Sequence, residues 1–401
     1  MEMDARRGRR AGEPPVDSEA VGVSARTLEE LASLAPTLLR LPRRSVDSQA
    51  ALLAAVVRAR EDVEAPYVCL SPSGTSALCA RIERRRVGVR VAHKMLGAFR
   101  ARILAVVDDG VVGDDPEWCV RHAFGLLAAG EVDAVQFQCL RIGSAEEAAV
   151  RRDSAGRTVQ REDPVVHLEV GVAGSYEEVV AARDRRSREG IRRSRRKFDQ
   201  LGDRRVITRW PADAADPEAL LAQMEAISST GYQRGMGVGF QRDPLHEELV
   251  RAGLAGGWFR AWVASVDAVP AVFWTTFAFG DRWTLYETAF AEEYADSAPG
   301  AGLLSHVIED ACTDSQVSTV GFGLGEARYK RDWASAEWMT SDVTIFGPRL
   351  RWRAVAGVQR GLSWAVSTAR RAMGEDRVQA LKKRLRARAA GAARRDAEHS
   401  G

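Results

Sequence analysis

The stretch "YETAFAEEYADSAPGAGLL", Tyr286–Leu304, decides the fold of the C-terminal half of the chain. A β-rich run leads into a loop, and an apolar helical pattern follows it. Main-chain N–H groups at a helix N-terminus lack partners within the helix, and the helix dipole favours an anion there. The pattern therefore predicts a phosphate-binding turn, although the same pattern also occurs in ordinary turns. The residues of this turn are Ser297, Pro299, Gly300, Ala301 and Gly302.

An antiparallel meander is predicted before this turn. Its runs are "GWFRAWVAS", "AVPAVFWTTFAF" and "DRWTLYETAF", and Val266-Asp267 and Gly280-Asp281 mark the bends between them. A dinucleotide-binding fold would instead alternate strands and helices from its beginning. The second glycine-rich stretch, "VGFGLGEARYKRDW", has the spacing G-x-G-x-G and lacks the acidic residue of a ribose site, so it is not a nucleotide fingerprint either.

The N-terminal half contains short β-rich runs, a helix predicted from Pro116 to Gly130 and a buried strand. The turn before that helix reads "DDGVVGDDPEW", and four carboxylates would repel a diphosphate. These are Asp108, Asp109, Asp114 and Asp115. We expect this half to bind no acyl-CoA and to form one wall of an acceptor cleft.

Length and composition set the domain organisation. A chain of 401 residues exceeds the usual size of a single core, which predicts two domains. We expect an α/β (α+β) fold of two tandem domains with mixed, largely antiparallel sheets, divided in the polar connection 143–164. The predicted parts are a disordered segment 1–25, an N-terminal domain 26–160, a C-terminal domain 161–350 and a basic helical tail 351–401.

Location and cofactors are inferred from what the sequence lacks. No apolar run approaches the roughly 18 residues that span a bilayer. The N-terminus has no apolar signal region, so a cytoplasmic protein is expected. The five cysteines form no CxxC pair and have no spacing typical of metal ligands, and no metal site is predicted.

Basic residues concentrate in two segments. Residues 183–205 contain eleven Lys or Arg and four Asp or Glu. Residues 351–401 contain thirteen Lys or Arg and four Asp or Glu. Such clusters bind nucleic acid, anionic lipid or an acidic substrate, or form a solvated face. Among the aromatic residues, Phe198 alone interrupts the first run, so nucleic acid is not the expected partner but stays open. Peripheral membrane contact through the tail also stays open.

The phosphate turn carries a family resemblance. The motif S-x-x-G-x-G lies here between a predicted strand and a predicted helix. This arrangement is similar to the R/Q-x-x-G-x-G/A loop by which GNAT-superfamily acyltransferases hold the diphosphate of acyl-CoA. With "IRRSRRKFDQLG" and "GFGLGEARYKRDWA", the chain resembles the CelD-like acetyltransferases of cellulose and exopolysaccharide biosynthesis. Those are relatives of the FemABX peptidyltransferases and have two tandem GNAT folds. The resemblance covers about residues 27–347, and Ser297 departs from the Arg or Gln of many GNAT enzymes.

The resemblance implies direct acyl transfer from acetyl-CoA or another acyl-CoA to a small-molecule or saccharide acceptor, such as an amino sugar or polysaccharide precursor. Main-chain N–H groups of the last meander strand would polarise the thioester. Glu287 would act as general base, and Tyr286 would point to the opposite face and bind substrate.

Further site residues are also implied by the resemblance. Tyr329 and Lys330 would lie at the reaction centre, where the lysine would stabilise developing negative charge. The substrate-binding residues would be Arg192, Arg196 and Trp333. The structural alternatives are an exposed strand acid for Glu287 and a surface lysine for Lys330, whereas His306 is expected to be a packing histidine.

Two other functions remain open from the sequence. One is FemABX-like transfer from an aminoacyl-tRNA, in which the arginine clusters would bind the tRNA. The other is a non-catalytic role in a polysaccharide-synthesis assembly. For an enzyme, the absence of a Ser/His or Cys/His nucleophile motif favours transfer without a protein-bound intermediate.

Overall fold

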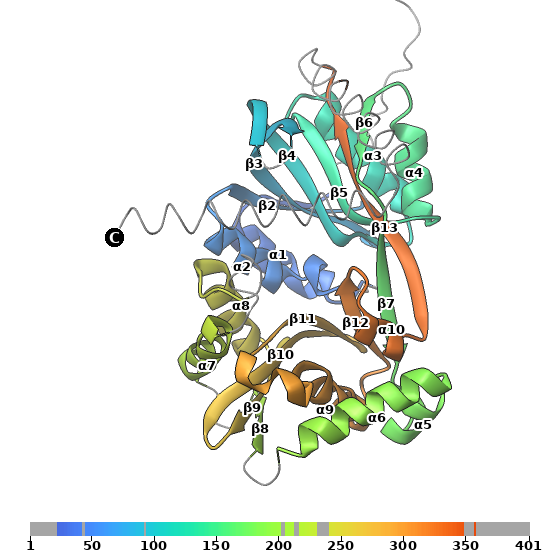
Figure 1. Ribbon diagram of the computed structural model, residues 1–401. Coiled ribbons are helices and arrows are strands. Elements are labelled where there is room, and N and C mark those ends of the chain that lie inside the picture. Colours follow the sequence, from blue (N-terminus) through green and yellow to red (C-terminus); the bar gives the residue numbers. More distant parts are fainter. Residues whose placement is uncertain are drawn as a thin grey trace, which may run out of the picture.

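The computed structural model describes residues 22–41, 45–91, 94–201, 205–211, 216–230 and 240–348, and residue 357. The described strands form one continuous sheet of 13 strands in the order β1-β2-β3-β4-β5-β13-β7-β12-β11-β10-β9-β8, with β6 paired to β13 (Figure 1). Helices cover both faces of this sheet. The fold is mixed α/β with largely antiparallel pairing, as the sequence predicted.

The N-terminal half contains two long strands and several helices. Its strands are β1 (Ser24–Ala25), β2 (Val63–Leu70), β3 (Ser76–Val91), β4 (Lys94–Gly113), β5 (Ala134–Arg141) and β6 (Thr158–Arg161). Its helices are α1 (Leu28–Leu38), the 3₁₀ helix η1 (Val46–Ser48), α2 (Ala50–Ala59), α3 (Pro116–Ala128) and α4 (Ala145–Asp153).

The C-terminal half contains the predicted meander. Its strands are β7 (Val165–Gly171), β8 (Arg205–Trp210), β9 (Phe259–Val266), β10 (Val269–Phe279), β11 (Arg282–Phe290), β12 (Thr319–Leu324) and β13 (Ala336–Phe346). Its helices are α5 (Tyr176–Ala181), α6 (Arg185–Asp199), α7 (Pro217–Thr230), α8 (Pro244–Ala255), the 3₁₀ helix η4 (Glu292–Ser297), α9 (Pro299–Thr313) and α10 (Arg328–Trp333).

The two halves repeat one topological unit. Strand β4 leads through α3 to the parallel strand β5, and β11 leads through α9 to the parallel strand β12. The other strand pairings among the described residues are antiparallel. Each half thus places a helix N-terminus after a long strand, and this is the position of the predicted phosphate turn.

Strand β13 joins the two halves. Its first part pairs with β7 and its second part with β5 and β6. Val343 and Ile345 are buried against the N-terminal core. The chain therefore returns to the N-terminal half after it completes the C-terminal one, and the sequence-based boundaries between domains remain predictions.

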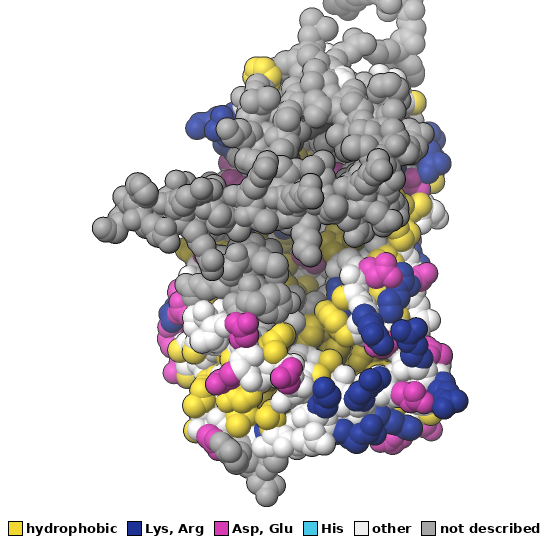
Figure 2. All heavy atoms as spheres, in the orientation of Figure 1, with side chains coloured by type: hydrophobic (Ala, Val, Ile, Leu, Met, Phe, Trp, Pro, Cys, Tyr) yellow, Lys and Arg dark blue, Asp and Glu magenta, His cyan; other side chains and the backbone are white. Residues whose placement is uncertain are grey.

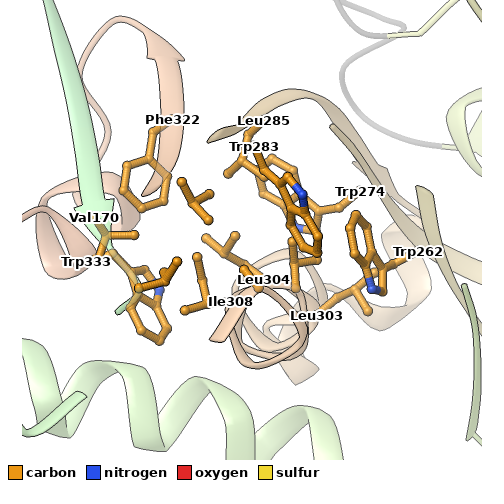
Figure 3. Packing of buried hydrophobic residues seen from close by; sticks show 14 of the residues in the cluster. Val170, Trp262, Trp274, Trp283, Leu285, Leu303, Leu304, Ile308, Phe322 and Trp333 are labelled. Atoms are coloured by element: carbon orange, nitrogen blue, oxygen red, sulfur yellow. The ribbon is translucent and has the colours of Figure 1, made fainter. Parts of the chain in front are cut away.

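Two hydrophobic cores sandwich the C-terminal part of the sheet. One lies between the sheet and α5, α6, α9 and α10, and Figure 3 shows its indole rings packed beside Leu303, Leu304 and Ile308 of α9. The other lies between the opposite face and α7 and α8. Side chains of α2 join this second core, so the N-terminal half is packed directly onto α8.

The secondary structure differs from the expectations in three places. Ser24–Ala25 form β1 and pair with β2, so order begins inside the segment predicted to be disordered. The connection 143–164 contains α4 and β6, and Ala149 and Val150 of α4 are buried in the N-terminal core. Helices α8 and α10 were not predicted at all. The predicted tail 351–401 lies outside the described residues except for residue 357, as do residues 1–21.

Candidate active site

The N-terminus of α9 begins the candidate site. Ala298 is the N-cap residue with a left-handed φ of 51°, and no side chain caps the helix. Pro299 occupies the first helical position and has no N–H, and the amide of Gly302 donates to the carbonyl oxygen of Ala298 at 2.8 Å. The amides of Gly300 and Ala301 are therefore the two first-turn donors without an intrahelical acceptor. They could bind an anion.

The equivalent turn of the N-terminal half is closed. Helix α3 also begins with a proline, Pro116, but its N-cap Asp115 accepts from the amide of Trp118 at 2.8 Å. Asp114 accepts from the hydroxyl groups of Thr75 and Ser76. A carboxylate thus occupies the place that an anion would take at α3, whereas the first turn of α9 has no such group.

Gly302 does not belong to the binding surface. It is buried, its amide is bonded to Ala298, and a Cβ at this position would lie 2.2 Å from Cβ of Phe198. The glycine is required because α6 crosses α9 at this point. The prediction that Gly302 contacts the cofactor is therefore wrong. Gly300 differs, since a Cβ there would meet its nearest neighbour, Cδ1 of Phe290, at 3.9 Å.

Strand β11 has a bulge beside this turn. Trp274 of β10 pairs with Thr288, and Thr276 pairs with Leu285, so two residues of β11 lie opposite Thr275. The two are Tyr286 and Glu287. Thr275 holds the bulge, because its hydroxyl accepts from the amide of Glu287 at 3.0 Å. The last paired residues of β11 and β12 are Thr284 and Gly321. The two strands therefore separate just before the bulge.

The bulge changes the faces of two predicted site residues. Strict alternation would place Tyr286 and Glu287 on opposite faces, but a bulge interrupts alternation. Both side chains meet His246 of α8: Oε1 of Glu287 lies 3.2 Å from Nε2, and the ring centroids of Tyr286 and His246 are 6.3 Å apart. The prediction of opposite faces is therefore wrong.

The carboxylate of Glu287 is held at one oxygen only. Its side chain is 18% exposed, and Oε2 is buried without a hydrogen-bond partner in the described part of the chain. Beside it, Tyr286 packs on Phe277 with ring centroids 4.5 Å apart, and burial raises the pKa of its phenol. A carboxylate oxygen without a partner can accept a proton once a bound nucleophile or a water molecule reaches it.

Tyr329 and Lys330 lie on α10 at the end of β12. Nζ of Lys330 donates to the carbonyl oxygens of Leu324 and Gly325, at 2.7 and 3.2 Å. These bonds use two of its three donors and leave the third for a ligand. Burial lowers the pKa of Lys330 and raises that of Tyr329 to about 12.

Trp333 is a core residue. It is 2% exposed and packs among the side chains between α9 and the sheet, with its ring 6.0 Å from that of Tyr176 (Figure 3). Direct contact with a substrate is incompatible with this burial, so that prediction is wrong. His306 packs against the ring of Phe198, and its Nε2 lies 3.3 Å from Oδ1 of Asp199, as expected of a packing histidine.

A basic face lies on α6. In Figure 2, Lys and Arg side chains gather over the part of the surface where Figure 1 places α5 and α6. Arg192 and Arg196 line a surface pocket of about 330 Å³ together with Tyr176 and Arg195. Arg195 is paired with Glu309 at 2.7 Å, but Arg192 and Arg196 are exposed and have no ion pair within the described residues. Nζ of Lys197, on the same helix, donates to the carbonyl of Asp296 beside the phosphate turn.

The described residues have neither a metal-binding cluster nor a membrane-spanning helix. They contain no group of three or more His, Cys, Asp or Glu side chains that could hold a metal ion. None of the helices described is both long and apolar enough to cross a membrane.

The geometry agrees with a family model. Residues 185–331 match the model of the acetyltransferase (GNAT) domain. Within this segment the chain is similar to GNAT-type acetyltransferase domains. The segment contains α6, the meander, the turn at α9 and Lys330, which are the parts that form the site. A search of curated proteins found no match to the sequence.

Solved structures with the same architecture match both halves. FemX is 10% identical with a TM-score of 0.57, and the match covers 81% of this chain and 98% of FemX. L-PGS from Bacillus licheniformis is 11% identical with a TM-score of 0.52, and the match covers 88% of this chain and 98% of L-PGS. A conserved protein of unknown function from Bacteroides thetaiotaomicron is 9% identical with a TM-score of 0.51, and the match covers 80% of this chain and 97% of that protein. At these identities the likeness concerns the fold.

Three residues of the site were missed by the sequence reasoning. Trp274 and Thr275 of β10 hold the turn and the bulge, and His246 of α8 holds Glu287. A signal for α8 was present, because Asp243-Pro244 is a capping pattern and Leu245 and Leu249 are apolar and four positions apart. Nothing in the sequence indicated that His246 lies beside a strand residue 41 positions away.

Proposed function

We propose that this protein is a GNAT-type acyltransferase that moves an acyl group from acyl-CoA directly to an amine or hydroxyl acceptor. The observation that carries the proposal is the contrast between the two repeated turns: α3 is capped by Asp115, whereas in the described part of the chain the amides of Gly300 and Ala301 at the start of α9 have no capping side chain. The diphosphate of acyl-CoA would bind at those amides. Its thioester would then lie along the bulged strand β11.

The chemistry follows from the groups around the bulge. The nitrogen or oxygen of the acceptor attacks the thioester carbon, and its proton passes to Oε2 of Glu287. The C–S bond breaks, and the sulfur leaves as CoA thiolate and takes up a proton. Tyr286 borders the acceptor, and Tyr329 and Lys330 face the developing negative charge, which an ammonium stabilises best in a site with little water. By its resemblance to CelD-like enzymes, the acceptor would be an amino sugar or polysaccharide precursor.

The turn can be tested by giving α9 the carboxylate of α3. Ala298→Asp places a negative charge at the N-cap, and Ala298→Asn is its neutral control, since both residues tolerate a left-handed φ. Acetyl-CoA and longer acyl-CoAs are titrated by calorimetry and thermal shift. A ligand at 100 times its Kd stabilises the wild type by about 2.7 kcal/mol. We expect A298D to weaken binding by about tenfold or more, and A298N to bind like the wild type. No thermal shift of the wild type with any acyl-CoA would reject the function.

A second candidate is transfer from an aminoacyl-tRNA, as in FemABX enzymes. Two observations favour it: the likeness to FemX extends over both halves, and Arg192 and Arg196 are exposed cations on α6. Their replacement by alanine should then weaken tRNA binding and reduce its salt dependence. Arg185→Ala is the control, because Arg185 is paired with Glu189. Binding of tRNA without any binding of acyl-CoA would decide for this candidate.

A further inference from the structure

His246 occupies an unusual position for a histidine that the sequence did not single out. It lies in the first turn of α8 with its side chain 15% exposed. Nε2 lies 3.2 Å from Oε1 of Glu287, and Nδ1 lies 2.9 Å from Oδ1 of Asp243. The edge of the ring meets Phe240, with centroids 5.2 Å apart. Nδ1 is close to Asp243 but makes no hydrogen bond within the described residues, so the contact of Nε2 with Oε1 and the packing on Phe240 hold the imidazole next to the carboxylate.

The charges around this imidazole are negative. Glu287 faces it from β11, and Asp243 faces it from the cap of its own helix. Tyr286 also faces it, and its phenol in turn feels the charges of Glu287, Asp243 and Asp47 of η1. Burial opposes the charged imidazolium, but the hydrogen bond and charge of Glu287 and the nearby charge of Asp243 raise the pKa of His246 above its usual value.

We propose that His246 is a positioning residue for Glu287: it holds Oε1, leaves Oε2 without a partner, and places a positive charge beside the carboxylate while the imidazole is protonated. The inference rests on the proposed acyl transfer. While His246 is an imidazolium, proton transfer to the carboxylate of Glu287 would break the ion pair between Nε2 and Oε1. After His246 loses its proton there is no ion pair to break, and the tautomer with its proton on Nε2 still donates to Oε1.

The coupling is measured on the full chain without any substrate. The chain contains six histidines, and the signal of His246 in ¹⁵N-imidazole NMR is identified by its loss in His246→Gln. Glu287→Gln should lower the pKa of His246, because it removes the largest attraction on the imidazolium. Asp199→Asn is the matched control, since Asp199 contacts His306 instead. An unchanged pKa of His246 in Glu287→Gln would overturn the inference, whatever the enzyme catalyses.

The consequence for catalysis is read from the pH profile. In the wild type, kcat should rise with pH through the pKa of His246. His246→Gln keeps a neutral N–H donor but cannot titrate, so it should remove this limb and leave the KM for acyl-CoA unchanged. His246→Ala also loses the orientation, which should lower kcat on the order of 100-fold. A limb that survives in His246→Gln contradicts the inference. Acyl transfer by no form of the protein rejects the proposed function, and the NMR result still decides the coupling.

Discussion

The indole N–H of Trp274 donates to the carbonyl oxygen of Gly300 at 2.7 Å, which ties the middle of β10 to the first turn of α9. The same indole meets the ring of Tyr329 edge to face, with centroids 5.9 Å apart. In the ladder, Trp274 pairs with Thr288, next to the bulge that carries Glu287. One side chain of β10 therefore fixes the phosphate turn, α10 and the bulge relative to one another.

Trp274→Phe should affect both stability and binding. The variant removes the donor to Gly300 and leaves that carbonyl without its partner, which costs about 1–3 kcal/mol. Because the turn is then less firmly held, the affinity for acyl-CoA should fall as well. The control is Trp262→Phe, which loses a comparable bond to Asp310 at 2.6 Å away from the turn. We expect the control to lower the unfolding temperature but not the affinity, and equal affinities in the two variants would contradict the role of Trp274.

The two glycines of the turn should respond oppositely to alanine. At Gly302 a Cβ collides with Phe198 where two helices cross, and such overpacking costs about 1–3 kcal/mol. At Gly300 a Cβ makes only ordinary contacts, so Gly300→Ala should leave stability unchanged or raise it by about 0.4–1 kcal/mol. Urea unfolding of both variants compares them directly. Equal losses would show that the crossing of α6 over α9 can relax.

Local signals in the sequence predicted much of the fold and less of the site. The meander and the helix at α9 each follow from apolar spacing and turn residues nearby in the chain. The return of β13 to the N-terminal half does not, because its register with β5 joins residues about two hundred positions apart. Pairing over such a distance leaves no trace in local spacing.

The errors within the site have the same physical origin. Alternation along β11 predicted opposite faces for Tyr286 and Glu287, and the bulge that overrides it depends on Thr275 of another strand. Gly302 matched the phosphate pattern, but the pattern could not show that Phe198 fills the space above it. Contacts between elements, rather than propensities within them, determined which predictions failed.

Lys330→Ala tests the ammonium at the end of β12. If Lys330 stabilises negative charge in the transition state, its loss should lower kcat on the order of 100- to 1,000-fold with a smaller effect on the KM for acyl-CoA. Arg331→Ala is a neighbouring control, because Arg331 is exposed and paired with Glu326 and Glu337. Exposed pairs contribute about 0–1 kcal/mol, so the control should keep its activity. Similar kcat values in the two variants would show that Lys330 has only a structural role, as the hydrogen-bond donor to the carbonyl oxygens of Leu324 and Gly325.

Two aspartates of the N-terminal half should change stability in opposite directions with pH. Burial, followed by the charges of Asp47 and Asp109, raises the pKa of Asp108 well above its usual value. Hydrogen bonds from Thr75 and Ser76 lower that of Asp114. A carboxyl group whose pKa is raised on folding binds its proton more tightly in the native state, so its contribution to stability is lost as pH rises through the folded pKa. The contribution of Asp114 is instead present at neutral pH and is lost as pH falls.

Asp108→Asn should therefore stabilise the protein at neutral pH, with an advantage that shrinks toward the unfolded pKa of about 3.9. Asp114→Asn should destabilise it at neutral pH and approach the wild type in acid. Thermal unfolding of the three proteins from pH 4 to 8 separates the two effects, since one difference curve rises with pH and the other falls. A destabilised Asp108→Asn at neutral pH would mean that the ionised carboxylate is the form that the fold stabilises. Asp108 would then be negatively charged at neutral pH in the half of the chain that we expect to form one wall of the acceptor cleft.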